Sequence, residues 1–281
     1  MKNKLFILIF LIAAGLLIPV SIWLSRSADC AENQMLYAIK DKAKIDSILE
    51  GVHSRYGTVE ERMKALALMR IGTPYSGGCL GEEKPPDDGP LFRLDVTDCT
   101  VFVLTNSAMA HQKSWNGARE MMKLINYYNP PAVGNQVVNY NNRIHFTYER
   151  LHRSPYFRDI SLELLPASQC EKVTLTLNIK SDGSKLLQIP WEKKVTALYI
   201  PSSAISAELL AKLPVACGVG FVKKKNFKLG IVVSHEGMII DRKYLIHANS
   251  ILGRVEKIDF LNYYFTVNPG YFDGVLISRF L

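Results

Sequence analysis

One of the five cysteines stands where covalent chemistry would need it. Cys99 follows Thr97 and Asp98, each a good N-cap residue, and the run after it contains no Gly or Pro to about residue 111. We therefore predict a helix that begins at Cys99. The unpaired N–H groups and the positive dipole end at such a position favour a thiolate and can stabilise an oxyanion. Cys99 is thus a candidate nucleophile, against the commoner role of a helical cysteine as a small buried residue.

Two of the six histidines lie close together in the stretch VVSHEGMIIDRKYLIHANS, residues 232–250. Its apolar, β-branched runs flank a polar turn near Asp241, which predicts a hairpin with His235 and His247 on neighbouring strands. One imidazole could accept the Cys99 proton while the other holds it in the required tautomer. Two alternatives stay open: each histidine is an ordinary hydrogen-bonded strand residue, or the three side chains ligate zinc.

The sequence around these residues changes from helical to strand-forming along the chain. Residues 31–70 read as helical, with a capping-box spacing between Thr58 and Glu61, and a further helix covers residues 114–128. Short β-branched and aromatic runs follow, so the order of elements is that of an α+β fold. The strands that we predict are 136–151, 172–179, 196–201, 218–224, 228–240, 243–250 and 274–280.

Two segments interrupt this pattern. Residues 72–90, GTPYSGGCLGEEKPPDDGP, are rich in Gly, Pro and acidic residues and predict a long irregular loop, a kind of loop that is often functional. Residues 137–165 are dense in basic and aromatic side chains and look like an insertion.

Length and composition allow one large or two small domains, because the chain has 281 residues and 48% of them are hydrophobic. The formal charge of +8 suits an anionic partner such as cell wall or lipid. Lys2 and Lys4 precede a run of twenty residues without charge, which indicates an export signal or an N-terminal membrane anchor within residues 1–28. We therefore expect an exported protein, for which nucleic acid is the least suitable partner.

The motifs IGTPYSGG, DCTVFV, SHEGMII and YLIHANS, taken in this order, resemble those of the NlpC-type cell-wall hydrolases in the papain-like group. Within that group the chain is most similar to the amidase-like branch called domain of unknown function 1460, over roughly residues 55–281. Further matches are YNNRIHF and the final GVLISR. The resemblance implies an α+β, papain-like fold, with the nucleophile at a helix N-terminus packed on an antiparallel sheet or barrel.

The same resemblance assigns roles to single residues. Cys99 would be the nucleophile, His235 the base, and His247 the polar residue that orients the base. Tyr75 would line the site near the thiol, and Asp98 would help to fix the turn that presents it.

Two residues of the YNNRIHF motif are candidates to bind substrate carboxylates. Arg143 can bind a carboxylate with two parallel hydrogen bonds, and His145 follows it closely; the alternative is a solvated basic loop. The chain also departs from the branch at Glu236, which replaces a small residue or valine after the base histidine. Such departures leave the three catalytic positions intact but bear on substrate detail.

The resemblance implies a catalytic domain at residues 31–281 that hydrolyses peptidoglycan fragments without a cofactor or metal. The expected bond is the amide between the N-acetylmuramoyl group and L-alanine. Two alternatives are a γ-D-glutamyl-diaminopimelate endopeptidase of the same fold and a non-catalytic module that binds the cell wall. The expected location is the periplasm, either in solution or anchored to the inner membrane.

Overall fold

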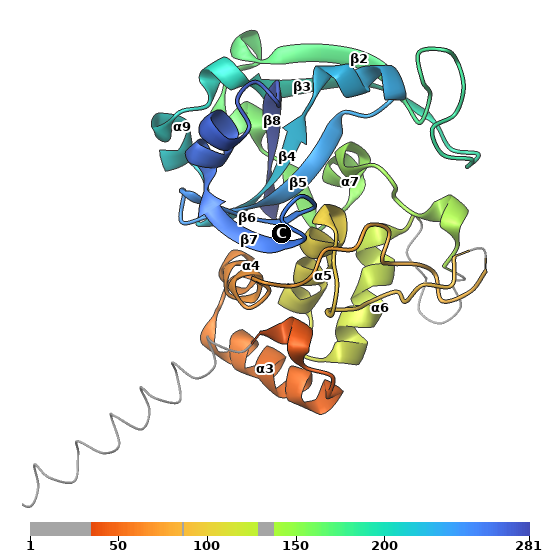
Figure 1. Ribbon diagram of the computed structural model, residues 1–281, viewed down its shortest axis with the longest axis vertical. Helices are drawn as coiled ribbons and strands as arrows, with labels where there is room; N and C mark the ends of the chain where they lie inside the picture. The colour runs from red at the N-terminus through yellow and green to blue at the C-terminus, as the bar shows by residue number, and fades with distance from the viewer. Residues whose placement is uncertain (1–34, 86, 129–137) are drawn as a thin grey trace, which may run out of the picture. The chain divides into compact units, whose positions relative to one another are not determined.

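An eight-stranded antiparallel sheet forms the C-terminal part of the structure, a computed structural model that describes residues 35–85, 87–128 and 138–281 (Figure 1). The strands are β1 (Phe157–Asp159), β2 (Glu171–Leu177), β3 (Lys193–Pro201), β4 (Ala216–Val222), β5 (Val233–Ile240), β6 (Tyr244–Asn249), β7 (Arg254–Asp259) and β8 (Gly274–Phe280). They lie in the order β2-β3-β8-β4-β5-β6-β7, and β1 pairs with β8. The central strand β4 is buried along its whole length, whereas the edge strand β7 is charged and largely accessible.

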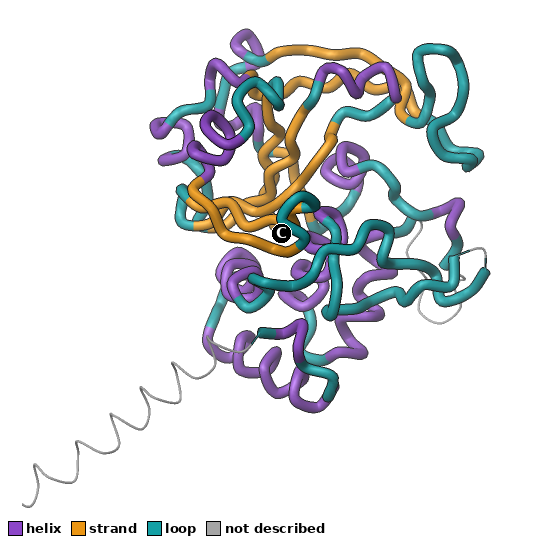
Figure 2. Tube along the Cα trace, viewed as in Figure 1, coloured by secondary structure: helices purple, strands orange, loops and turns teal. Residues whose placement is uncertain are grey.

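The helices are α3 (Lys42–Arg55), α4 (Val59–Leu68), α5 (Cys99–His111), α6 (Trp115–Asn126), α7 (Thr147–Arg153), α8 (Ser161–Leu164) and α9 (Ala207–Ala211). Helices α3 to α6 precede the sheet in the chain and gather on one side of it (Figure 2), whereas α8 and α9 come between strands in the chain and pack on its other face. The predicted capping box of Thr58 and Glu61 is present at the start of α4. Helix α5 is the central one, because it is buried from Val101 to Ala110 and packs against α4, α6, β5 and β6. The predicted α+β class, with Cys99 at a helix N-terminus packed on an antiparallel sheet, is confirmed.

The hairpin that carries the two histidines forms as predicted, from β5 and β6. Its turn places Asp241 and Arg242 in the left-handed region, with φ of 53° and 56°. Gly237 faces the opposite strand so closely that a Cβ there would lie 2.8 Å from the Cβ of His247. The absence of a side chain at this position therefore leaves the space in which His247 lies beside His235.

Besides the short strand β1, which was not predicted, two strand predictions differ from the structure. Residues 136–151 were expected to form a strand, but the described part of this segment contains a turn and then helix α7. Here buried ion pairs of Glu149 and Arg150 outweigh the β propensity of the neighbouring aromatic residues. Conversely, β7 was not predicted, because its sequence RVEKID is mostly charged and shows no apolar run. An edge strand tolerates such charges since only one of its sides is hydrogen-bonded.

The described residues of Met35–Leu281 form one compact unit. The predicted signal peptide or anchor at residues 1–28 lies outside the described residues, as does the start of the predicted insertion at residue 137. The described remainder of that insertion, 138–165, supplies α7, β1 and α8, and β1 pairs with β8 of the main sheet. No helix in the described ranges is both long and apolar enough to cross a membrane.

Candidate active site

The start of α5 presents Cys99 through a well-fixed cap. Asp98 is the N-cap residue, and its two carboxylate oxygens accept hydrogen bonds from Val101 N at 2.8 Å and Gly78 N at 3.1 Å. The second bond ties the cap to the acidic loop that was predicted at residues 72–90. Within the described residues, no acceptor is found for the backbone N–H groups of Cys99 and Thr100. These two groups are therefore free to bind a negatively charged oxygen beside the thiol.

The two histidines are hydrogen-bonded to each other and to a carboxylate. Nε2 of His235 lies 2.8 Å from Nδ1 of His247, which is the contact predicted between them. Nε2 of His247 lies 3.2 Å from Oε1 of Glu256 on β7, its direct partner across the strand pair. Asn249 donates to the same oxygen at 2.6 Å, and the ring of Tyr263 packs edge-on against His247 at 4.6 Å. The result is a chain of polar groups that crosses three adjacent strands.

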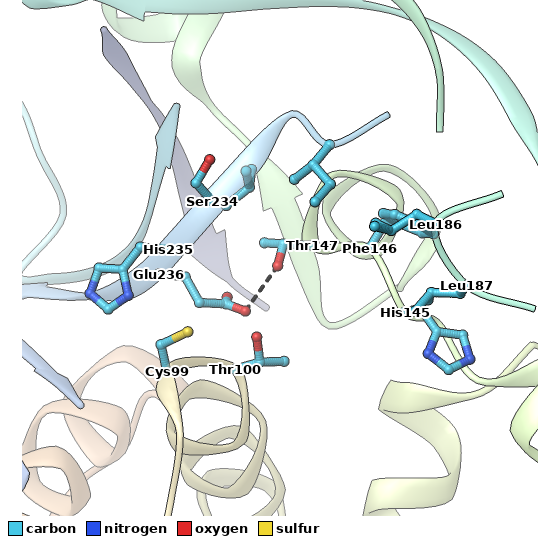
Figure 3. Close-up of a pocket in the computed structure, with 12 residues that line it drawn as sticks. Cys99, Thr100, His145, Phe146, Thr147, Leu186, Leu187, Ser234, His235 and Glu236 are labelled. Carbon is cyan, nitrogen blue, oxygen red and sulfur yellow. Dashed lines mark hydrogen bonds between the residues drawn. The ribbon is translucent and has the colours of Figure 1, made fainter. Parts of the chain in front are cut away.

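Cys99 and His235 line one cavity of about 220 Å³, and the sulfur points toward the strand that carries the histidine (Figure 3). The cavity lies between the start of α5, the beginning of β5 and the segment before and at the start of α7. Its wall is partly apolar, with a few polar groups close to the thiol, as in many small-molecule sites. The other lining residues are Thr100, His145, Phe146, Thr147, Leu186, Leu187, Ile231, Val233, Ser234 and Glu236.

Burial sets the proton affinities of this pair. Burial first, and then the charges of Glu236 and Asp98, raise the pKa of the Cys99 thiol to about 12, and hydrogen bonds to the sulfur offset only part of this. Burial and the neighbouring His247 lower the pKa of His235 to about 3. Burial therefore opposes the thiolate that the helix start favours.

A buried ion pair forms the wall of the cavity next to the thiol. Glu236 accepts a hydrogen bond from Thr147 Oγ1 at 2.9 Å and is paired through its other oxygen with Nη2 of Arg150. Both charged side chains are buried, and the guanidinium also lies 5.2 Å from the ring centre of Phe157. The arginine places a positive charge behind the carboxylate, so the negative charge nearest to the thiol is compensated within the protein.

The remaining predicted site residues occupy different surroundings. Tyr75 is half-buried, and burial, followed by the neighbouring Cys99 and Asp98, raises the pKa of its phenol. His145 lines the cavity, and its Nε2 is hydrogen-bonded to the backbone oxygen of Tyr140 at 2.8 Å. Tyr75 therefore lies near the thiol, whereas His145 lies at the far end of the cavity from it (Figure 3).

Arg143 does not line the cavity, although it was predicted to bind substrate carboxylates. Its Nε donates to Glu82 at 2.8 Å, and its Nη2 pairs with Glu82 and, at 3.0 Å, with Asp87. The guanidinium thus fastens the acidic loop to the segment before α7. Its carboxylate partners in this structure belong to the protein itself, so its binding of substrate carboxylates stays a prediction.

The zinc alternative would require free lone pairs on both histidine rings. Instead, Nε2 of His235 and Nδ1 of His247 face each other, and the second ring nitrogen of His247 faces Glu256. No group of three or more His, Cys, Asp or Glu side chains in the described part of the chain is arranged to hold a metal ion. The geometry is that of a hydrogen-bonded relay.

The other described cysteines lie away from the cavity lining. Cys79, Cys170 and Cys217 are free thiols, as is Cys99, whereas Cys30 lies outside the described residues. Burial raises the pKa of Cys79 to about 11 and that of Cys217 to about 12. Unlike Cys99, neither of these thiols shares the cavity with His235.

Two features of the site escaped prediction from the sequence. Glu256 lies opposite His247 only because of the register between β6 and β7, and β7 itself gave no signal. Glu236 was visible beside His235, but its partner Arg150 lies 86 positions away in a segment predicted as a strand. The glycine-containing turn before β7 is the one local cue that another strand follows β6.

Solved structures share this fold at low sequence identity. A Legionella pneumophila protein assigned to domain of unknown function 1460 has a TM-score of 0.66 and 20% identity, covering 86% of this chain and 97% of that one. An N-acetylmuramoyl-L-alanine amidase from Bacteroides uniformis has a TM-score of 0.56 and 17% identity, covering 80% and 100%. A Bacteroides fragilis protein provisionally called a xylanase has a TM-score of 0.57 and 20% identity, covering 76% and 98%. At these identities the likeness concerns the fold alone.

The family of the chain is assigned by a family model, because structures of such low identity show the fold alone. A comparison with the curated proteins finds no match. The model called AmiA-like, described as N-acetylmuramoyl-L-alanine amidase-like, matches residues 66–270. This range contains Cys99, His235, His247 and Glu256, and it spans well over half of the chain. The chain therefore belongs to the N-acetylmuramoyl-L-alanine amidase-like family, whose members are hydrolases with a peptidoglycan-related function.

Proposed function

We propose that the chain is a cysteine amidohydrolase that acts on peptidoglycan fragments and cleaves the amide between the N-acetylmuramoyl group and L-alanine. One observation carries the reaction type. The Cys99 thiol, at a helix start with two free N–H groups, shares a cavity with His235, whose ring is held by His247. These are the nucleophile, the oxyanion donors, the base and the orienting group that acyl transfer requires.

The proposed reaction begins with a neutral thiol and a neutral imidazole. As the sulfur attacks the amide carbonyl, its proton passes to the ring nitrogen of His235 that faces the cavity. The N–H groups of Cys99 and Thr100 hold the oxyanion of the tetrahedral intermediate. His235 then protonates the leaving amine, which leaves an acyl thioester on Cys99. Water, deprotonated by the same imidazole, hydrolyses the thioester and regenerates the thiol.

The choice of bond rests on family membership, and residues around the cavity are candidates for recognition. His145 and Thr147 line the cavity, and Tyr75 forms a bridge with Thr97, two residues before Cys99. We propose that Tyr75 and His145 contact the substrate, while Asp98 acts through the cap that it forms. Arg143 is paired with Glu82 and Asp87 and is not part of this proposal.

Mass analysis of products from defined muropeptides tests the proposal. The unaltered chain should release intact stem peptide from the muramyl group, and Cys99→Ala should abolish release while its unfolding transition stays unchanged. Cys170→Ala, which removes a thiol outside the cavity, is the matched control and should retain full activity. Cleavage between γ-D-glutamate and diaminopimelate would identify the endopeptidase alternative. Persistent release by Cys99→Ala would exclude the cysteine mechanism.

We further propose that the chain is exported and acts in the periplasm, in solution or held at the inner membrane by its N-terminal segment. Residues 5–24 carry no charge, and basic residues precede them. Cell fractionation combined with mass analysis of the N-terminus tests this. Recovery of the full-length chain in the cytoplasmic fraction would contradict it.

A further inference from the structure

A glutamate that belongs to none of the sequence motifs is connected to His235 through one intervening ring. Glu256 on β7 lies directly opposite His247 on β6, and His247 in turn contacts His235 on β5. The two contacts are 3.2 Å and 2.8 Å long. No other carboxylate among the described residues is hydrogen-bonded to either ring.

The hydrogen positions along this chain follow from the carboxylate end. A carboxylate accepts hydrogen bonds only, so Nε2 of His247 carries the hydrogen that lies between it and Glu256. In a neutral ring Nδ1 of His247 is then bare and accepts, so Nε2 of His235 carries the next hydrogen. Nδ1 of His235 is left bare, and this is the ring nitrogen on the side of the Cys99 sulfur (Figure 3).

We propose that Glu256 is a positioning residue which, through His247, keeps the basic nitrogen of His235 bare and directed at Cys99. The inference rests on the proposed function, because it concerns the base of that reaction. With the opposite hydrogen order, Nδ1 of His235 would carry a hydrogen and could not accept the thiol proton. When Nδ1 does take that proton, Glu256 also lies where its negative charge stabilises the imidazolium through His247.

The surroundings of Glu256 suit an acceptor that stays ionised. Its side chain is 20% exposed, and Asn249 donates to the same oxygen that faces His247. The hydrogen bond from His247, and then that from Asn249, hold the pKa of the Glu256 carboxyl below its usual value although burial opposes this. Asn249 therefore orients the carboxylate so that its Oε1 faces Nε2 of His247.

Two variants of Glu256 distinguish the effect of its hydrogen-bond-accepting oxygen from the effect of its negative charge. Glu256→Leu removes both, whereas Glu256→Gln retains an oxygen that Asn249 and His247 can share. We expect kcat on muropeptides to fall roughly tenfold to a hundredfold in Glu256→Leu, with little change in KM, and to be partly restored in Glu256→Gln. Glu50→Gln, which changes an exposed glutamate on the distant helix α3, should leave kcat unaltered.

Nitrogen NMR of the full chain labelled with ¹⁵N-histidine reads the ring hydrogens without any substrate. The unaltered chain should show His235 with hydrogen on Nε2 and bare Nδ1, and Glu256→Leu should show a mixture of the two tautomers. Hydrogen on Nδ1 of His235 in the unaltered chain, or identical ring signals in both proteins, would overturn the proposal. Absence of muropeptide hydrolysis by the unaltered chain would contradict the proposed function, and the ring signals would still decide the role of Glu256.

Discussion

Two glutamates flank the Cys99–His235 pair, and the protein holds them in opposite ways. Glu236 follows the base in the sequence and is buried against Arg150, with Thr147 on its second oxygen. Glu256 lies on another strand and has no cation as its hydrogen-bond partner among the described residues; His247 and Asn249 donate to it.

The difference shows that the role of each carboxylate depends on its hydrogen-bond or ion-pair partner, and not on how close the glutamate is to His235 in the sequence. The charge of Glu236 disfavours the thiolate, since it is the second cause, after burial, of the raised pKa of the Cys99 thiol. Its pairing with Arg150 limits this effect and stabilises the cavity wall. The charge of Glu256 is instead directed at the histidines. One glutamate thus serves the structure of the site, and the other serves its chemistry.

The largest effect on stability is expected from breaking the Glu236 pair. Arg150→Met leaves a buried carboxylate without its cation and should lower the free energy of unfolding by about 3 to 5 kcal/mol. The double variant Arg150→Met with Glu236→Leu should recover most of this loss, because no unpaired charge remains. Urea unfolding of the full chain measures both. Equal losses in the single and double variants would show that the pair is not the source.

The next largest effect on the free energy of unfolding is expected at Gly237, which follows Glu236 and lies against His247. In Gly237→Ala the new Cβ would lie 2.8 Å from the Cβ of His247 and 2.9 Å from the oxygen of Ile246. We expect a loss of about 1 to 3 kcal/mol in the free energy of unfolding, together with lower activity as His247 is displaced. Gly51→Ala on α3, where nothing lies within 4 Å, is the matched control and should be neutral or stabilising. Similar losses at both positions would argue against crowding at His247.

The pH dependence of stability tests the buried base itself. The pKa of His235 is lowered to about 3 in the folded state, whereas an unfolded histidine titrates near 6.5. As the pH falls below about 6.5 the unfolded chain takes up the proton first, so stability is lost from there toward the folded pKa. Between pH 7 and pH 5 the unaltered chain should lose roughly 1 to 2 kcal/mol more than His235→Gln. Parallel pH profiles of the two proteins would contradict a buried, neutral base.

The smallest effect concerns the reactivity of the thiol. Removing the charge of Glu236 in the double variant with Arg150→Met should lower the pKa of the Cys99 thiol and raise its alkylation rate severalfold, since burial remains the main cause of the shift. Glu256→Gln should produce no such increase. Peptide mass analysis after iodoacetamide treatment at fixed pH follows Cys99 alone. An increase in Glu256→Gln as large as in the double variant would remove the distinction between the two glutamates.

Much of the fold and part of the site follow from local sequence. The cap at Asp98, the helix after it and the histidine hairpin depend on neighbouring residues, and all three are present in the structure. The helix α7 did not follow, because its stability depends on ion pairs with distant residues such as Glu236 and Lys193. The partners of Arg143, Glu82 and Asp87, could not be read from local sequence for the same reason.

Local sequence is enough to predict which side chains are available and on which elements they lie: a thiol at a helix start and two histidines on one hairpin. Their burial depends on the tertiary structure, and burial raises the pKa of the Cys99 thiol and lowers that of His235, against what a helix dipole alone would favour. The tertiary structure also decided that Glu256 completes the chain of polar groups, since the register of β6 and β7 sets which residue faces His247. Capping and hairpin formation act between neighbours in the chain, whereas desolvation and strand register depend on the whole packed domain.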